Sequence, residues 1–77
     1  MEKIFGQVLK ELRSGNNLSQ EKLSEITGLD RTYISMLERG IRQPSLSTLS
    51  QIADAFKIKT SELIKMLEIK IDNEASI

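Results

Sequence analysis

Apolar residues recur every three or four positions along most of this chain, and that period restricts the fold more than any other feature of the sequence. The spacing gives a helix one apolar face, and no strand-like alternation runs for a useful length. Glycines and the Gln43-Pro44 pair interrupt the pattern at short intervals. Glycine accepts a left-handed backbone, and a residue before proline is pushed out of the α region. The sequence therefore predicts an all-α fold, a compact bundle of five helices.

The interruptions set the expected bounds of these helices. They cover about residues 2–14, 20–26 and 31–39, then one segment from Leu46 to Phe56 and one from Thr60 to Ile71. Residues 73–77 have no apolar period and are expected to form a frayed tail. We expect residues 1–72 to form a single domain.

Short polar side chains mark the expected helix starts. A side-chain oxygen at the N-cap accepts a bond from a free backbone N–H group, and four residues are placed for this role: Ser19, Asp30, Ser45 and Thr60. Gly15 is expected to end the first helix in the left-handed conformation.

The composition excludes several kinds of chemistry. The chain has 77 residues with no Cys and no His, so it has no disulfide framework, no thiolate or imidazole metal site, and no Ser-His or Cys-His nucleophile pair. No Gly-rich phosphate loop or nucleophile-base set is recognisable. We therefore expect neither an enzyme nor a cofactor. A core of this size supplies only about 3 to 5 kcal/mol, which favours an oligomer.

The sequence also argues against a membrane protein. Its N-terminus has no signal-peptide pattern, and its longest apolar run is far below the roughly 20 residues of a membrane span. We expect a soluble, cytoplasmic protein.

Residues 19–40, SQEKLSEITGLDRTYISMLERG, have the pattern of a helix-turn-helix. Gly28 supplies the turn residue with positive φ. Five apolar residues at suitable spacing are expected in the core, where they fix the crossing of the two helices: Leu23, Ile26, Leu29, Ile34 and Leu37.

The stretch LSQEKLSEITGLDRTYISMLERGIRQPSLSTLSQIADAF resembles the Cro/C1-type (XRE-like) helix-turn-helix family of phage repressors. Within that family, LDRTYIS followed by LERG and a basic loop is most similar to the controller proteins of bacterial restriction-modification systems. The resemblance covers about residues 5–68. It implies a lambda-repressor-like DNA-binding domain that dimerises through its C-terminal helices. It also implies control of its own gene and of a restriction endonuclease gene, with activation at one site and repression at another.

The second helix of this motif is expected to enter the major groove with its first turn leading. Arg31, Thr32 and Ser35 are predicted to contact base edges, and Arg31 has the fork that bonds guanine O6 and N7. Contacts to the DNA backbone or groove edge are predicted for Ser19, Gln20, Tyr33, Arg39, Arg42 and Gln43.

Some of these residues have simpler interpretations. Gln20 is also a good helix former for an exposed position, and Tyr33 could pack on the protein surface instead of touching DNA. Arg39, beside Glu38, could be a solvated helix end, and Arg31 a merely exposed first residue of its helix. The helix dipole disfavours a cation at that first position, which favours the DNA contact for Arg31.

The last helix carries more apolar residues than one stripe needs. Leu63, Ile64, Leu67 and Ile71 lie on one arc that a five-helix monomer can cover, while Met66 and Ile69 lie on a neighbouring arc. Exposed apolar surface argues for a partner. The predicted homodimer interface consists of Leu63, Met66, Leu67 and Ile69. The alternative is that Met66 and Ile69 pack against the first helix.

The sequence thus predicts a homodimeric, sequence-specific transcriptional regulator on a pseudo-palindromic DNA operator, with no small-molecule effector. Pairing of dimers into a tetramer on DNA stays open, and the alternative is a protein-interaction module of the same fold, such as an antitoxin or anti-repressor. The net charge is zero, but Arg31 to Gln43 contains three Arg and one Glu. Non-specific DNA binding should therefore be weak, and affinity should depend on base contacts and two half-sites.

Overall fold

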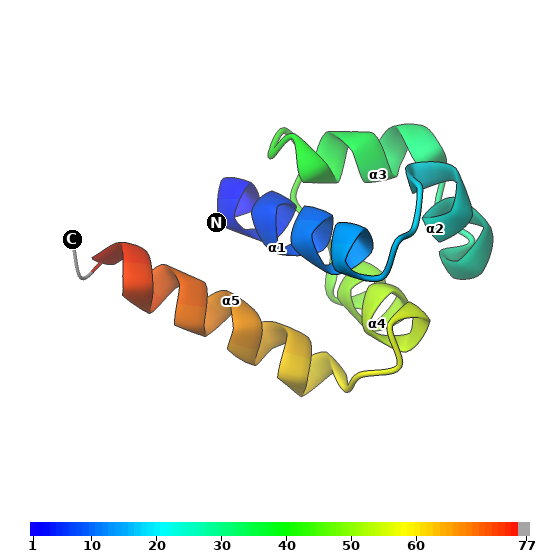
Figure 1. Cartoon of the computed structure of the whole chain (residues 1–77). Coiled ribbons are helices and arrows are strands. Elements are labelled where there is room, and N and C mark those ends of the chain that lie inside the picture. The colour runs from blue at the N-terminus through cyan, green and yellow to red at the C-terminus, as the bar shows by residue number, and fades with distance from the viewer. Residues whose placement is uncertain (76–77) are drawn as a thin grey trace.

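The computed structural model describes residues 1–75, and these residues form five helices and no strand. The helices are α1 (Glu2–Gly15), α2 (Gln20–Thr27), α3 (Arg31–Glu38), α4 (Leu46–Ala55) and α5 (Thr60–Ala75). Figure 1 shows α1 in the middle, with α3 along one side and α5 along another. Helix α2 packs on both α3 and α4. The prediction of an all-α, five-helix fold is confirmed.

All five helices contribute to one core. Its ten buried apolar residues are Phe5, Val8, Leu9, Leu23, Ile34, Leu37, Ile52, Ala53, Leu63 and Leu67. Each helix supplies between one and three of them, so no helix buries its apolar face without the others. The motif formed by α2 and α3 is therefore held on a scaffold of α1, α4 and α5. None of the helices in the described part has the length and apolar character needed to cross a membrane.

Three of the four predicted N-cap positions are confirmed: Ser19, Asp30 and Ser45. The Ser19 Oγ accepts a bond of 3.0 Å from the Lys22 N–H, and the Ser45 Oγ accepts one of 3.1 Å from the Thr48 N–H. Asp30 is the N-cap residue of α3, but its side chain makes no capping bond. The prediction for Thr60 was wrong, because Thr60 is already the first helical residue of α5. Glu62 serves that helix start instead, because its Oε1 accepts a bond of 2.8 Å from the Lys59 N–H.

The end of α1 also differs from the prediction. Gly15 is the last residue of the helix and has no positive φ, and the left-handed residue is Asn17, with φ of 57°. Asparagine tolerates this conformation better than other non-glycine residues, so the turn after the helix does not need a glycine at position 17. The Leu18 N–H bonds the Arg13 carbonyl oxygen at 3.0 Å and closes the turn.

Three apolar side chains lie farther from the core than their spacing predicts, and one of them is Ile64 of α5, which is 37% exposed. Ile26, predicted to be buried, is 46% exposed, because it lies at the rim of the short helix α2 beside Ala55 and Lys57. Leu46 is the first residue of α4 and is also exposed, because the buried residues of this helix begin only at Thr48. The helical period therefore locates the buried face but not its ends.

Helix α5 is longer than predicted. Residues 73–75 of the expected frayed tail are helical, and residues 76–77 lie outside the described part of the chain. Packing on α1 supports the extension, because the Lys70 Nζ lies 2.9 Å from a carboxylate oxygen of Glu11. Asn73 and Glu74 border the same groove between α1 and α5, so the helix continues past its last apolar residue.

Candidate nucleic-acid interface

The turn between α2 and α3 is fixed by its own side chains. Gly28 has φ of 77°, as predicted, and follows directly after α2. The Thr27 hydroxyl donates to the Leu23 carbonyl oxygen at 2.7 Å and accepts from the Leu29 N–H at 3.1 Å. The Ser24 hydroxyl donates to the Leu29 carbonyl oxygen. These bonds hold the backbone of the turn from Leu23 to Leu29, and sequence reasoning assigned none of them.

Helix α3 has a buried face and an outward face. Ile34 and Leu37 are fully buried in the core. Arg31 and Thr32 are exposed in the first turn, and Ser35 is half-buried one turn later. Positions 31, 32 and 35 fall on one arc of a helix. The three predicted base-contacting residues therefore share the outward face of α3, at the end where the helix begins.

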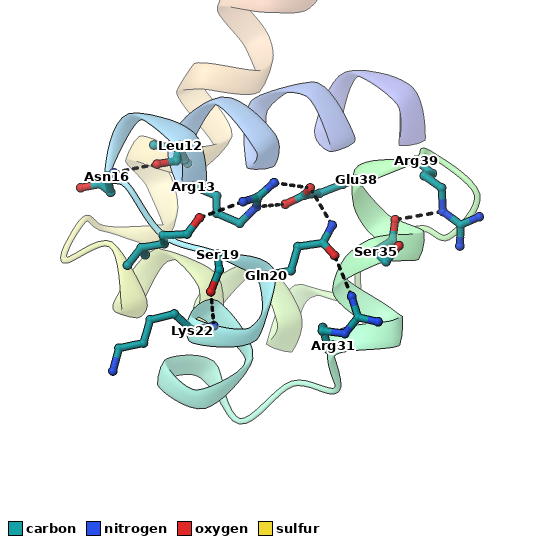
Figure 2. A network of polar contacts seen from close by, with 11 residues as sticks. Leu12, Arg13, Asn16, Ser19, Gln20, Lys22, Arg31, Ser35, Glu38 and Arg39 are labelled. Carbon is teal, nitrogen blue, oxygen red and sulfur yellow. Dashed lines mark hydrogen bonds and ion pairs between the residues drawn. The ribbon is translucent and has the colours of Figure 1, made fainter.

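A polar network joins that face to α1. The Arg13 Nε lies 2.6 Å from Glu38 Oε2, and an Arg13 terminal nitrogen donates to Glu38 Oε1 at 3.1 Å. The Gln20 amide nitrogen donates to the same Glu38 oxygen at 3.1 Å, and the Gln20 amide oxygen accepts from Arg31 at 3.3 Å. Figure 2 shows the four side chains as one chain of contacts from α1 to the start of α3. Through Gln20, the network connects the exposed Arg31 side chain to the ion pair of Arg13 and Glu38.

The ion pair at the inner end of this network is largely withdrawn from solvent. The Glu38 side chain is only 4% exposed, and the Arg13 side chain is partly buried. The hydrogen bond to Glu38 raises the pKa of Arg13, and the Coulombic attraction of Glu38 adds to it, against the opposing effect of burial. The third Arg13 nitrogen, Nη1, donates to the Leu18 carbonyl oxygen at 2.8 Å, in the link before α2.

The structure shows what Gln20 and Tyr33 contact within the chain. Gln20 is half-buried and bonded at both ends of its amide, so it is not simply an exposed helix former. Tyr33 is half-buried, and its hydroxyl lies 3.3 Å from the Thr48 Oγ1 at the start of α4. The Arg42 guanidinium carbon lies 5.8 Å from the centre of the Tyr33 ring, within the range of a cation–π contact. Tyr33 thus packs on the protein surface and holds the loop after α3.

The other predicted backbone-contacting residues are exposed. Ser19 lies at the N-terminus of α2, and Arg39, Arg42 and Gln43 lie at or after the end of α3. The Arg39 Nε donates to the Ser35 carbonyl oxygen at 3.4 Å, a long bond at an exposed site. Two surface regions, one before α2 and one after α3, therefore flank the outward arc of α3.

The predicted dimer interface divides into buried and exposed residues. Leu63 is fully buried and Leu67 is 7% exposed, so both belong to the core of the monomer and their assignment to an accessible interface was wrong. They face α1 and α4 because the first arc of α5 closes the bundle. Met66 and Ile69 are 38% and 52% exposed, and they line a groove of about 670 Å³ between α1 and α5. The remaining apolar lining of this groove comes from Val8 and Leu12.

Comparison with known proteins places this geometry in a family. A family model described as helix-turn-helix matches residues 9–63. The control protein C.SmaI of Serratia marcescens is 40% identical over 70 residues, which cover 91% of this chain and 83% of that protein. The crystal structure of the restriction-modification controller protein C.AhdI from Aeromonas hydrophila has 45% identity and a TM-score of 0.76, and the match covers 80% of this chain and 94% of that one.

A second similar structure is a complex with DNA. It contains the restriction-modification controller protein C.Esp1396I as a tetramer with its natural 35 base-pair operator. The identity is 30% and the TM-score 0.82, over 91% of this chain and 92% of that one. The extent of these matches and the helix-turn-helix formed by α2 and α3 show that this chain belongs to the helix-turn-helix family that includes the restriction-modification controller proteins.

Proposed function

We propose that this chain is a sequence-specific, DNA-binding transcriptional regulator of the restriction-modification controller type. The observation that carries the proposal is the outward arc of α3, where Arg31, Thr32 and Ser35 lie together and Arg31 is held by the network from α1. In this role the chain needs no catalytic group and no cofactor. Its place would be the cytoplasm, beside the DNA that it regulates.

In this proposal α3 enters the major groove with its first turn leading. Arg31 retains N–H groups beyond the one bonded to Gln20, and a guanidinium fork matches guanine O6 and N7. Thr32 offers a methyl group to thymine or a hydroxyl to a base edge. Ser35 lies deeper along the same arc. These three side chains would select the sequence.

The flanking residues would hold the domain on the DNA backbone. The N-terminus of α2, at Ser19 and Gln20, presents helix N–H groups of the kind that bind phosphate. On the other side of α3, Arg39, Arg42 and Gln43 are exposed. Because Arg42 also stacks near Tyr33, this pair would fix the loop as it approaches the groove edge.

We further propose that the active form is a homodimer whose second copy covers the groove between α1 and α5. Met66 and Ile69 are large apolar side chains that are exposed there, and exposed apolar surface favours a partner. The core of a 77-residue chain also supplies little stability, which favours an oligomer. The similar controller protein C.Esp1396I occupies its operator as a tetramer. A two-fold dimer would place two α3 helices in successive major grooves, about 34 to 36 Å apart, on a pseudo-palindromic operator.

A binding titration tests this function directly. The DNA segment upstream of the gene for this chain is compared with random DNA of equal length by gel shift at moderate salt. The expected result is binding to the upstream segment that is about 10³-fold tighter or more, in the range of specific regulators. Equal affinity for both DNAs would contradict the proposal and would favour a protein-interaction module of the same fold.

A further inference from the structure

The polar network behind α3 has a direction, because its members differ in what they can donate and accept. A carboxylate accepts hydrogen bonds and donates none, whereas an amide does both and a guanidinium only donates. Glu38 Oε1 accepts from the Gln20 amide nitrogen at 3.1 Å. The Gln20 amide therefore has one orientation, with its oxygen turned toward Arg31, whose Nη1 lies 3.3 Å away.

Arg13 holds Glu38 in the form and position that this orientation requires. Glu38 receives two bonds from Arg13, of 2.6 Å and 3.1 Å, and its side chain is almost fully buried. A buried carboxylate needs such a cation, because an isolated charge away from water is costly. With Arg13 in place, Glu38 is a fixed acceptor facing Gln20.

Arg31 is the member of the network that needs positioning. It is the first residue of α3, where the helix dipole disfavours a cation, and its side chain is exposed. The Gln20 oxygen is the acceptor that the structure gives it. A long arginine side chain without such an acceptor samples many rotamers, and ordering them on binding DNA lowers affinity.

We propose that Glu38, acting through Gln20, is a positioning residue for base recognition by Arg31. Neither the buried Glu38 nor its partner Arg13 needs to touch DNA. The pair sets the orientation of the Gln20 amide, and the amide oxygen holds Arg31 in the conformation that reads its base pair. This inference rests on the proposed DNA-binding function and identifies which residues behind α3 determine its selectivity.

The test measures base selectivity rather than affinity alone. Arg31→Ala first identifies the operator position that Arg31 reads. This is the base pair whose substitution lowers the affinity of the wild-type protein but not that of Arg31→Ala. The selectivity at that position, the ratio of affinities for the natural and the substituted base pair, is then measured for Gln20→Met. This variant keeps the length of the side chain and leaves the pair of Arg13 and Glu38 intact. The expected result is a loss of selectivity of about two- to tenfold, the range of one net hydrogen bond.

Two further variants separate positioning from other roles. Glu38→Gln replaces one of the two acceptor oxygens with an NH2 group, so Arg13 and Gln20 must share the one oxygen that remains, and selectivity is expected to fall at the same position. Combined with Gln20→Met, it should lose no more than either variant alone. Ser19→Ala is the matched control. It removes the capping bond from the Lys22 N–H to the Ser19 Oγ at the same end of α2, but it changes no member of the network. It should lower affinity for all sequences alike.

The outcomes distinguish this inference from the function on which it rests. If Arg31→Ala changes selectivity but Gln20→Met lowers affinity for all sequences equally, positioning is refuted and Gln20 acts on phosphate only. If Arg31→Ala leaves selectivity unchanged at every position, the proposed base contact itself fails. Should Glu38→Gln not fold, by circular dichroism, Gln20→Met still decides the question.

Discussion

Gly6 sets how closely α1 approaches the C-terminal end of α3, and replacing it with alanine should destabilise the fold. A Cβ at this position would lie 2.6 Å from the carbonyl oxygens of both Leu37 and Glu38. Both obstacles are backbone atoms, so a change of rotamer cannot relieve the overlap and the helices must move apart. Overpacking of this kind costs about 1 to 3 kcal/mol, and here the upper end applies.

Alanine has a higher helix propensity than glycine, which offsets about 1 kcal/mol of that cost. The expected net loss in the free energy of unfolding is about 2 kcal/mol for Gly6→Ala. For a domain of this size, it corresponds to a fall in Tm of about 8 to 16 °C. Because α3 would be displaced at Glu38, operator affinity should fall as well.

Gly15→Ala is the matched control in the same helix. Gly15 is helical, and a Cβ there would meet no atom within 4 Å. This variant should gain up to about 1 kcal/mol. Thermal and urea unfolding of both variants at one protein concentration, followed by circular dichroism, provides the comparison. A Gly6→Ala protein as stable as wild type would refute the close approach of α1 and α3.

Three further changes test the packing and the dimer. In urea unfolding, Leu23→Ala should lower the free energy of unfolding by about 2 to 5 kcal/mol, whereas Ile26→Ala, at the exposed rim of the same helix, should lower it by less than about 1 kcal/mol. Similar losses for the two variants would contradict a core that includes Leu23 but not Ile26. Ile69→Lys should shift the protein from dimer to monomer in analytical ultracentrifugation while its helix content is unchanged, and a dimer of undiminished affinity would rule out the groove between α1 and α5 as the interface. Tyr33→Phe removes the bond to Thr48 and should cost about 0.5 to 1.5 kcal/mol in thermal unfolding, with no cost if the tyrosine does not hold the loop.

The fold was largely readable from the sequence because each of its signals is local. The period of three and four residues locates every helix, Ser19 and Ser45 mark two of their starts, and Gly28 marks the turn. The residue that ends a helix was harder to predict. Gly15 and Asn17 both tolerate the left-handed conformation, and the sequence alone does not say which of them adopts it.

The site was only partly readable, because its support comes from contacts between distant segments. The outward arc of α3 follows from helix geometry, but Arg13 and Glu38 lie 25 positions apart in different helices. Opposite charges are frequent in this chain, and no spacing rule selects this pair. Similarly, the α5 pattern indicates two apolar arcs, but only the packed bundle shows that Leu63 and Leu67 belong to the core and Ile69 to the surface.

The central claim is that α3 reads base pairs through Arg31 while the loop after it contacts the DNA backbone. Affinities for the operator and for every single base-pair substitution, measured at several salt concentrations for Arg31→Ala and Arg42→Ala, test it most directly. Arg31→Ala should lose about 1 to 3 kcal/mol of discrimination at one or two positions. Arg42→Ala should weaken binding to all sequences alike and lower the salt dependence by about one counterion. Uniform weakening by Arg31→Ala, with selectivity intact at every position, would contradict the account.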